Sequence, residues 1–349
     1  MEATKTIKTK ILELRKGKRE LLTREYENFQ RYLHGDKIAP LYSATRQQAE
    51  RLLRRIKQPK EGKEYPLILR NDTYKVEKRA TKLTAYWLKI PIANIRGGIF
   101  VPIRPHTPIP DGARLREAKT IRREGEWFVY ITVQAEIPQR RTAHVLAVDL
   151  GIHNPAVTVN SKKLGPTFYG KSLRSIRGHY FHLRRKLGEK KALETIRKIG
   201  SHERRIVNHE LHKISKAIVQ EAAESNSTIV LGDLKGLRRR RRGRKFNRKL
   251  HGFPYRKLAW FIEYKAQWLG IPVVKVSEAY TSQNCSRCGQ RGLRVRGLFR
   301  CPHCGLNLNA DWNGARNILQ RGIGELKRQS MLGAPLTVPI TLPRLAVNR

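Results

Sequence analysis

The sequence predicts a multidomain α+β protein, in which an antiparallel barrel or sandwich is followed by an α/β domain with a small metal-binding insertion. Three observations support this fold class. Short β-rich runs broken by Gly and Pro extend from Tyr65 to Ile137, as is typical of antiparallel sheets. Beyond Arg140, strand-like runs alternate with helical runs, which favours a largely parallel sheet. All four cysteines cluster between Cys285 and Cys304.

The charge of the chain indicates a polyanionic partner. Its 349 residues contain 73 Lys and Arg against 28 Asp and Glu, which gives a formal net charge of +45. Such self-repulsion brings no benefit to an enzyme of small neutral metabolites, and nucleic acid is the commonest polyanion that relieves it. A hydrophobic fraction of 39% excludes wholesale disorder. Ribosomal and architectural proteins are similarly basic, but they rarely need this length and several cores.

No membrane association is expected. The chain has no run of 18 apolar residues, and its first residues lack the apolar core of a signal peptide. We therefore expect a soluble protein that works inside the cell.

The N-terminal part begins with a strand at Thr6–Leu14 and continues into a helical module. Apolar side chains recur at helical spacing from Leu22 to Leu33 and again from Ala49 to Ile56. The sequence thus predicts an antiparallel barrel or sandwich over residues 1–17 and 63–140, with the helical module of residues 18–62 inserted into it. The expected barrel strands after the module are Tyr65–Leu69, Ala85–Ile90, Ile99–Ile103 and Trp127–Val133.

The α/β domain is expected over residues 141–282 and 306–322. A buried strand ends at Asp149, and Ala156–Asn160 pairs with it across a short turn. A long basic helical stretch follows, then strand Thr228–Leu231, an aromatic helix and strand Pro272–Val276. Ala310–Leu319 is expected to form the last helix, and residues 323–349 a tail.

The cysteines form the pattern C-x2-C-x12-C-x2-C, at Cys285, Cys288, Cys301 and Cys304. Two close pairs separated by a short hairpin place four thiolates around zinc, whereas a disulfide framework would spread its cysteines along the chain. We expect a structural zinc knuckle over residues 283–305. A site with four protein ligands is closed and leaves no open position for catalysis. The basic segment 290–300 is expected to contact phosphate.

Three carboxylates at the ends of strands or helices are candidate metal ligands, although each also has a simpler interpretation. Asp149 could be a turn residue, Asp311 could cap its helix, and Glu278 could be a surface acid. Together in a polyanion-binding protein, they suit two Mg²⁺ ions that activate a water and stabilise the leaving oxygen of a phosphodiester.

Other motifs favour nucleic-acid contact or carry no chemistry. The run Arg238–Arg242, extended by Arg244 and Lys245, is expected to contact phosphate. The same expectation applies to basic side chains on the long helical stretch, namely Arg174, Arg177, Arg184, Arg185 and Lys186. In His209-Glu210-Leu211-His212 the histidines are three apart, not the four of a metalloprotease helix, and no phosphate-binding GxxxxGK[ST] loop is present.

Four segments, in order, resemble the TnpB family of transposon-encoded proteins, which is related to type V CRISPR effectors and to eukaryotic Fanzor proteins. The resemblance covers about residues 125 to 320 and includes the cysteines, whereas the first 124 residues share only the layout. The segments are Ala147-Val-Asp-Leu-Gly-Ile-His-Asn154, Ile229-Val-Leu-Gly-Asp-Leu-Lys-Gly236, Thr281-Ser-Gln-Asn-Cys-Ser-Arg-Cys-Gly289 and Asn309-Ala-Asp-Trp-Asn-Gly-Ala-Arg-Asn-Ile318.

The resemblance implies an RNA-guided DNA endonuclease with a RuvC (RNase H-like) α/β domain that contains the zinc-ribbon insertion. It also implies an N-terminal wedge β-barrel with an inserted helical recognition module. Its partners would be a guide RNA derived from the transposon end and a double-stranded DNA target beside a short flanking motif. The expected form is a monomeric ribonucleoprotein in the cytoplasm, at the nucleoid, of a prokaryote.

One departure from the family concerns Gly232. In much of the family the second RuvC motif ends in Ile-Glu-Asp-Leu and that Glu binds metal, but here the position is glycine. Asp233 is a poor substitute, because a shift of one residue on a strand points the side chain to the other face. Some TnpB and Fanzor relatives have a Gly here and a Glu further downstream, as at Glu278.

The predicted catalytic and magnesium site is therefore Asp149, Glu278 and Asp311, with Glu278 supplied from the neighbouring strand about 4.8 Å away. Two alternatives remain open: a nuclease-inactive, RNA-guided DNA-binding repressor, and a structural RNA-binding protein.

Overall fold

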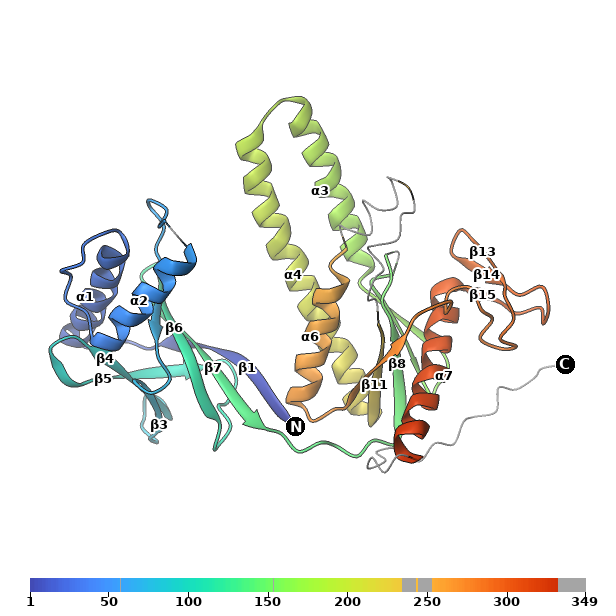
Figure 1. Ribbon diagram of the computed structural model, residues 1–349, viewed down its shortest axis with the longest axis horizontal. Coiled ribbons are helices and arrows are strands. Elements are labelled where there is room, and N and C mark those ends of the chain that lie inside the picture. The colour runs from blue at the N-terminus through green and yellow to red at the C-terminus, as the bar shows by residue number, and fades with distance from the viewer. Residues whose placement is uncertain (57, 153, 234–242, 244–252, 332–349) are drawn as a thin grey trace. The chain divides into compact units, whose positions relative to one another are not determined.

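The computed structural model describes residues 1–56, 58–152, 154–233, 243 and 253–331 (Figure 1). The chain divides into two compact units, one spanning Glu2–Glu136 and the other comprising Met1 and the chain from Ile137 onward. We refer to them as the N-terminal unit and the C-terminal unit. Within the described residues, no helix combines the length and the apolar composition needed to cross a bilayer.

The N-terminal unit is built on a seven-stranded sheet in the order β2-β6-β7-β1-β5-β4-β3. Every neighbouring pair of strands in this sheet is antiparallel, as the sequence predicts. The strands are β1 (Glu2–Ile11), β2 (Leu67–Leu69), β3 (Lys75–Lys78), β4 (Tyr86–Ile92), β5 (Ile95–Pro105), β6 (Arg114–Arg123) and β7 (Glu126–Glu136).

The helical module lies between β1 and β2, where the sequence places it. It consists of α1 (Lys16–Leu33) and α2 (Ser43–Ile56). Glu25 joins the module to the sheet, because its carboxylate accepts hydrogen bonds from the backbone N–H of Tyr42, at 3.1 Å, and of Ala93, at 2.9 Å.

The C-terminal unit contains a five-stranded sheet in the order β10-β9-β8-β11-β12. β8, β11 and β12 run parallel, and β9 and β10 are antiparallel to their neighbours. Both the predicted β8–β9 pairing and the predicted adjacency of β11 and β12 are confirmed. The strands are β8 (His144–Asp149), β9 (Ala156–Asn160), β10 (Pro166–Tyr169), β11 (Ser227–Asp233) and β12 (Val273–Ser277).

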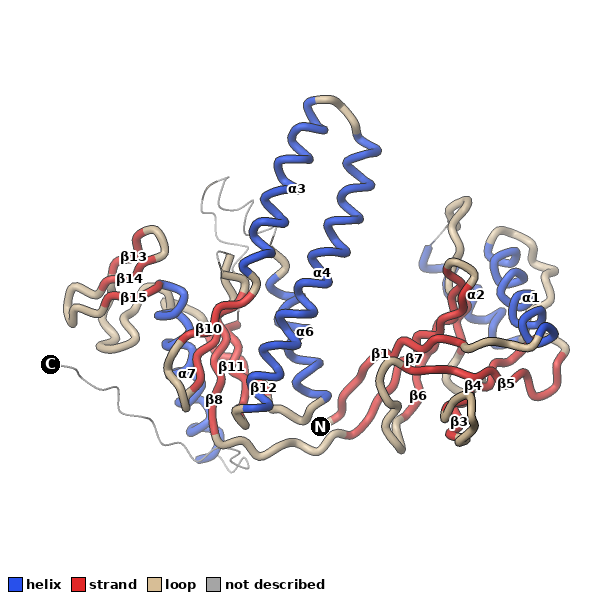
Figure 2. Tube along the Cα trace, turned by 180° about the vertical axis from the view of Figure 1, so that it is seen from behind, coloured by secondary structure: helices blue, strands red, loops and turns tan. Residues whose placement is uncertain are grey.

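Helices cover both faces of this sheet (Figure 2). α4 (Leu193–Glu224) and α6 (Tyr255–Trp268) pack on one face, in a core that includes Leu146 and Leu231. α7 (Ala310–Met331) packs on the other face, against Val145 and Val230. The side chains that face α4 and α6 alternate along each strand with those that face α7, because successive strand side chains point to opposite faces.

Two boundaries differ from the sequence prediction. The long basic stretch forms two helices, α3 (Lys171–Glu189) and α4, which are joined at Lys191 with a φ of 53°. The tail predicted to begin at residue 323 is wrong in its first part, because α7 continues to Met331. Ile323 and Leu326 are buried against the sheet, and this burial extends the helix.

A third, small sheet lies between β12 and α7. It is antiparallel, with strands β13 (Leu293–Val295), β14 (Leu298–Arg300) and β15 (Asn307–Asn309). Phe299 is fully buried in its core, beside Cys285 and Cys301. The fold class, a mixed α/β protein of several parts, is thus confirmed.

Candidate carboxylate centre and cysteine knuckle

The parallel strands bring two of the predicted acids to one edge of the sheet. Asp149 is the last residue of β8, and Glu278 directly follows β12. β11 lies between these strands and pairs with both, with Gly232 in register with Val276. The carboxyl ends of all three strands therefore meet where ligands bind in open α/β sheets.

Strand pleating places these positions on one face. Val145 and Val230 face α7, so Asp149 and Gly232 fall on the same face by the two-residue period. Val276 also faces α7, and Glu278 is two residues further on. Asp233 falls on the opposite face, as predicted.

The Glu278 side chain fills the space over Gly232. A Cβ added to Gly232 would overlap the Cγ, Cδ and Oε1 atoms of Glu278. Any larger residue at position 232 would expel this carboxylate, so the glycine is what allows Glu278 to reach across from the next strand.

Helix α7 brings the third acid and makes room for the first. A Cβ added to Gly314 would lie 2.6 Å from Asp149 Oδ2, so the Asp149 carboxylate rests on the helix backbone. Asp311 lies in the first turn of α7 but does not cap it. Asn309 is the cap, since its Oδ1 accepts the backbone N–H of Asp311, at 2.9 Å, and of Trp312, at 3.2 Å.

Both oxygens of Asp311 are held by side chains from other elements. Asn154 Nδ2 donates to Oδ2 at 2.7 Å, and Arg294 Nη2 donates to Oδ1 at 2.7 Å. Asn154 lies in the loop after β8, and Arg294 lies on β13. The Asp311 carboxylate is therefore fixed in orientation from two sides.

Burial and mutual repulsion disfavour the ionised forms of two of these acids. Desolvation raises the pKa of Glu278, and the charges of Asp149 and Asp233 raise it further. Desolvation and the charge of Asp311 raise the pKa of Asp149, while the Arg294 guanidinium opposes this rise. A cation at this edge would favour the ionised form of both carboxyl groups.

The donor chemistry of these acids suits a divalent cation, although within the described chain their oxygens do not all converge as closely as the cysteine sulfurs do. Glu278 Oε1 is buried and finds no hydrogen-bond partner within the described chain, and such an orphaned oxygen is costly. The donors are hard carboxylate oxygens, which Mg²⁺ prefers.

The four cysteines form a second centre, which we call the cysteine knuckle (residues 283–305). Their sulfur atoms all lie within 4.8 Å of one another, and within the described chain they are the one group of three or more candidate ligands that meets so closely. Tetrahedral zinc with Zn–S bonds of about 2.3 Å needs such spacing. Gly289 and Gly305 have φ angles of 77° and 70°, as the turn positions require.

Helix α7 also anchors the base of the knuckle through two buried asparagines. Asn313 accepts the Ser286 N–H at 2.9 Å and donates to the Asn284 carbonyl at 2.7 Å. Asn317 donates to the carbonyls of Thr281, at 2.7 Å, and of Asn284, at 2.8 Å. The same helix thus positions both the carboxylate centre and the knuckle.

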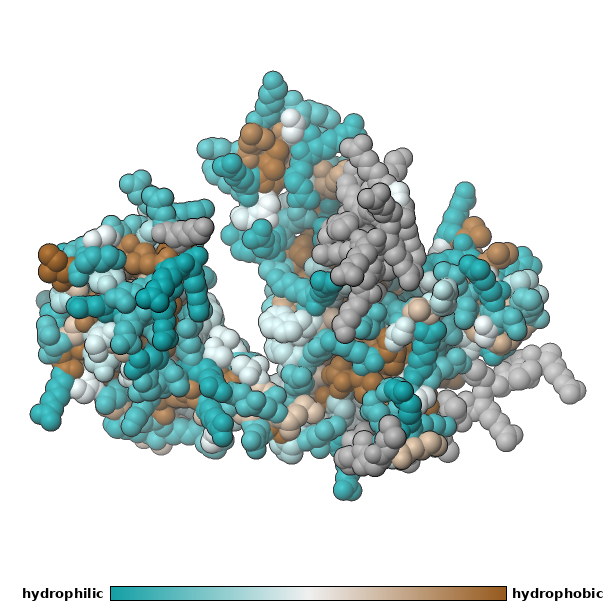
Figure 3. All heavy atoms as spheres, in the orientation of Figure 1, coloured by the Kyte–Doolittle hydropathy of each residue, from teal (hydrophilic) through white to brown (hydrophobic). Residues whose placement is uncertain are grey.

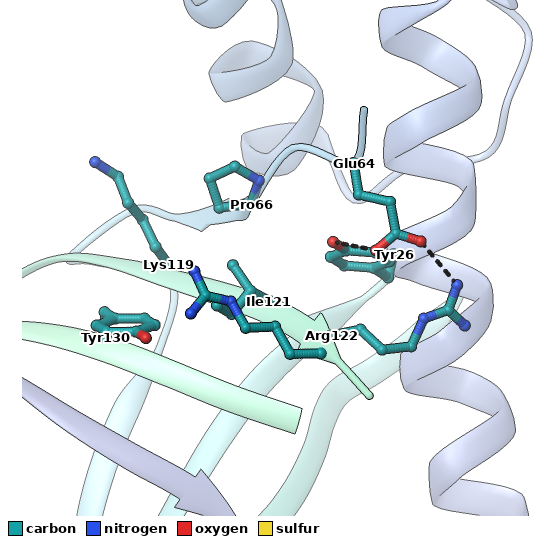
Figure 4. Close-up of a pocket in the computed structure, with 8 residues that line it drawn as sticks. Tyr26, Glu64, Pro66, Lys119, Ile121, Arg122 and Tyr130 are labelled. Atoms are coloured by element: carbon teal, nitrogen blue, oxygen red, sulfur yellow. Dashed lines mark hydrogen bonds and ion pairs between the residues drawn. The ribbon is translucent and has the colours of Figure 1, made fainter. Parts of the chain in front are cut away.

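The N-terminal unit has a basic pocket of about 320 Å³, which the sequence does not predict (Figure 4). Tyr26 donates to Glu64 at 3.2 Å and Arg122 donates to the same carboxylate at 3.1 Å. Cationic and aromatic groups of this kind suit nucleic-acid backbones and bases. The lining residues are Tyr26, Glu64, Pro66, Lys119, Ile121, Arg122, Arg123 and Tyr130.

The basic residues predicted to contact phosphate differ in their exposure. Residues 238–242, 244 and 245 lie outside the described residues. On α3, Arg174, Arg185 and Lys186 are exposed, whereas Arg184 forms an ion pair with the nearly buried Glu203.

The histidine motif lies within α4, as its interpretation as ordinary helix requires. His212 stacks on Phe261 with ring centroids 4.0 Å apart. This contact packs α4 against α6.

Three residues of the carboxylate centre were not singled out from the sequence. Asn154 and Gly314 lie inside segments that resemble the TnpB family, so this resemblance could have identified them as site residues. Arg294 is one of several arginines in the knuckle, and nothing in the sequence distinguishes it from its neighbours.

Comparisons with known proteins match both the site region and the fold. Residues 255–318 match the family model described as "Cas12f1-like, TNB domain". The chain is 34% identical over 145 residues to a TnpB-like protein of Methanocaldococcus jannaschii, covering 40% of this chain and 52% of that protein. It is 29% identical over 238 residues to the CRISPR-associated endodeoxyribonuclease Cas12f1 of Sulfoacidibacillus thermotolerans, covering 60% and 53%.

A solved structure supports the fold. A Cas12f1–sgRNA–target DNA complex has a TM-score of 0.56 and 15% identity, with 86% of this chain and 79% of that one covered. The matched region spans about half the length of the two curated relatives. The similarity to TnpB proteins that the sequence motifs indicate is confirmed, and the comparisons add Cas12f proteins to it.

Proposed function

We propose that this protein is an RNA-guided DNA endonuclease of a transposable element, and that Asp149, Glu278 and Asp311 form its magnesium site. The observation that carries the proposal is the seating of the Glu278 carboxylate over Gly232. It lies on the sheet face that also holds Asp149 and that packs against α7, whose first turn carries Asp311. The Glu278 carboxylate thus takes the place of the acidic side chain that is missing at position 232.

Each residue of the site has a distinct task. Asp149 and Glu278 would hold the cations from the ends of β8 and β12, two parallel strands separated by β11, and Asp311 would close the site from α7. Asn154 fixes the Asp311 carboxylate by its hydrogen bond. Divalent ions bound there supply Lewis-acid chemistry, which activates a water and stabilises the leaving oxygen of a phosphodiester.

The charge and the surface support nucleic acid as the partner. The chain carries a net charge of +45, and hydrophilic residues cover most of the described surface on the face in Figure 3. We propose that a guide RNA from the transposon end directs the protein to double-stranded DNA beside a short flanking motif. The basic pocket in the N-terminal unit would hold part of that nucleic acid.

Cleavage by the purified ribonucleoprotein tests the proposal. RNA that copurifies is sequenced, and a matched DNA library is offered with Mg²⁺. We expect cleavage by the wild type and loss of at least about a hundredfold in rate for Glu278→Gln, since a ligand carboxylate is removed. Glu325→Gln is the matched control, because it removes an acid from an exposed ion pair on α7.

A relocation variant makes the test sharper. Gly232→Glu combined with Glu278→Ala returns the carboxylate to β11 and clears the space that it needs. We expect this double variant to recover part of the activity that Glu278→Ala loses. Full activity of Glu278→Gln would refute the assignment of Glu278. Guided binding without cleavage by the wild type would instead support the nuclease-inactive repressor, and binding that ignores the guide would support a structural RNA-binding protein.

A further inference from the structure

One ion pair joins the hairpin of the cysteine knuckle to the carboxylate centre. Arg294 Nη2, from β13, lies 2.7 Å from Asp311 Oδ1, at the start of α7. The Arg294 side chain is 38% exposed and the Asp311 side chain only 12%. The guanidinium therefore covers a nearly buried carboxylate from the solvent side.

This guanidinium places a positive charge directly on one oxygen of Asp311. Asn154 already donates to Oδ2 at 2.7 Å, so both carboxylate oxygens face hydrogen-bond donors. The charge of Arg294 also acts on Asp149, whose pKa it lowers. A divalent cation bound between these acids would lie close to a fixed positive charge, and the two would repel each other.

We infer that Arg294 is a resident counter-charge of the carboxylate centre, which must leave Asp311 before a divalent cation binds there. The inference rests on the proposed function, because it assumes that these carboxylates hold divalent cations. It adds a regulatory step: the free protein keeps its own cation in the site and has low affinity for the metal.

A phosphodiester has the chemistry to release Arg294. The hairpin also exposes Arg291, Arg296 and Arg300, so a nucleic-acid strand would be attracted to this surface. A phosphate that approaches the centre offers Arg294 a new anionic partner, with bidentate geometry that suits guanidinium. Arg294 then exchanges Asp311 for the phosphate, and the divalent cation replaces its charge at the carboxylates. Metal binding is thereby coupled to substrate binding.

Magnesium affinity of the full-length, zinc-loaded chain without nucleic acid tests this inference. Binding is measured by isothermal titration and by the rise in unfolding temperature that Mg²⁺ causes. Arg294→Gln removes the charge with little change in size, Arg294→Lys keeps the charge, and Arg300→Gln removes the same charge from the paired strand. We expect Arg294→Gln to bind Mg²⁺ about tenfold more tightly than wild type, and the other two to stay near wild type.

The displacement step needs a second measurement. With a saturating single-stranded DNA oligonucleotide present in both samples, we expect the difference in Mg²⁺ affinity between wild type and Arg294→Gln to shrink. A difference that persists unchanged would overturn release by phosphodiester.

The outcomes separate this inference from the proposed function. Unchanged or weaker binding by Arg294→Gln would overturn the counter-charge, and so would an equal gain in Arg300→Gln, which would mean a general effect of net charge. If wild type still binds Mg²⁺ and Asp149→Asn does not, the metal site itself stands. Absence of Mg²⁺ binding in every variant, Arg294→Gln included, would refute both.

Discussion

A single glycine decides which strand supplies an acid to the candidate centre. Gly232 leaves a space that the Glu278 side chain enters from the end of β12, so a carboxylate from another strand can reach the centre without a change in the sheet. Glu278 could be predicted from the sequence, because parallel neighbouring strands and their spacing follow from the α/β pattern. The structure adds how closely the Glu278 side chain lies over Gly232.

The raised pKa of Glu278 predicts how metal binding depends on pH. Below this raised pKa the carboxyl group holds a proton, which must leave before a cation binds. Mg²⁺ affinity should therefore rise with pH, by up to about tenfold per pH unit for each proton released. Titration calorimetry between about pH 6.5 and pH 8.5 measures this, with buffers of different ionisation enthalpy to count the protons.

The control for this prediction is Glu278→Gln, which cannot release that proton. It should bind Mg²⁺ more weakly and with a smaller dependence on pH. Affinity of the wild type that stays constant over this range would show that the carboxyl group is already ionised in the metal-free protein.

The residues that the sequence did not single out share a physical character. Asn154 contacts Asp311 from 157 residues earlier in the chain and Arg294 from 17 residues earlier, and no local pattern specifies either contact. Residues that recur with a spacing or end a strand, such as Cys285 and Asp149, could be identified. The predictable part of the site is thus the part set by local geometry.

At the level of elements, α7 organises the centre. Its first turn carries Asp311, its Gly314 accommodates Asp149, and its Asn313 and Asn317 hold the base of the knuckle. The apolar spacing from Ala310 to Leu319 predicts the helix but not its full length, since the residues after 322 combine buried and charged positions.

Removal of zinc should unfold the knuckle and leave the five-stranded sheet intact. The knuckle core is small, with Phe299, Leu306 and Leu308 as its main apolar side chains, so metal binding supplies much of its folding energy. After chelation, trypsin should cut within residues 291–300 at least about tenfold faster, while the helices on the sheet stay protected. Limited proteolysis followed by mass spectrometry measures both rates.

A variant and a rescue complete that experiment. Cys288→Ser should behave like the chelated protein, and added zinc should restore protection to the chelated wild type but not to the variant. Equal protection with and without zinc would show that the asparagine contacts with α7 alone hold the knuckle.

Strand β6 shows why some elements escape prediction. It runs through Arg114–Arg123, and its pairing with β7 shifts register between Leu115 and Ala118. A bulge of this kind breaks the two-residue period, and the many charged side chains hide the few buried ones. Pairing with β2 and β7, rather than a local sequence pattern, determines this strand.

For the molecule as a whole, the net charge of +45 predicts nucleic-acid binding that weakens steeply with salt. Each phosphate contact releases condensed counterions, so contact with six or more phosphates should lower affinity by roughly 10³-fold or more between about 50 and 200 mM salt. Filter binding or fluorescence anisotropy with a DNA duplex gives the slope. Arg123→Ala, in the basic pocket, should reduce the slope by about one.

A slope near zero would exclude an interface dominated by phosphate contacts. It would also contradict the interpretation that the net positive charge serves to bind nucleic acid. An unchanged slope for Arg123→Ala would instead place the contacts outside the pocket. The fold class, the cluster of four cysteines and the adjacency of β11 and β12 could be predicted from composition and pattern, whereas the pocket depends on how α1 meets the sheet.

The competition between positions 232 and 278 for one volume has an evolutionary consequence. Acids at both positions would crowd and repel each other, and acids at neither would leave the centre incomplete. A lineage that changes from one arrangement to the other must therefore pass through an impaired ancestor. Such a transition is easiest while the gene is duplicated or under weak selection, because a copy with reduced activity is then not eliminated.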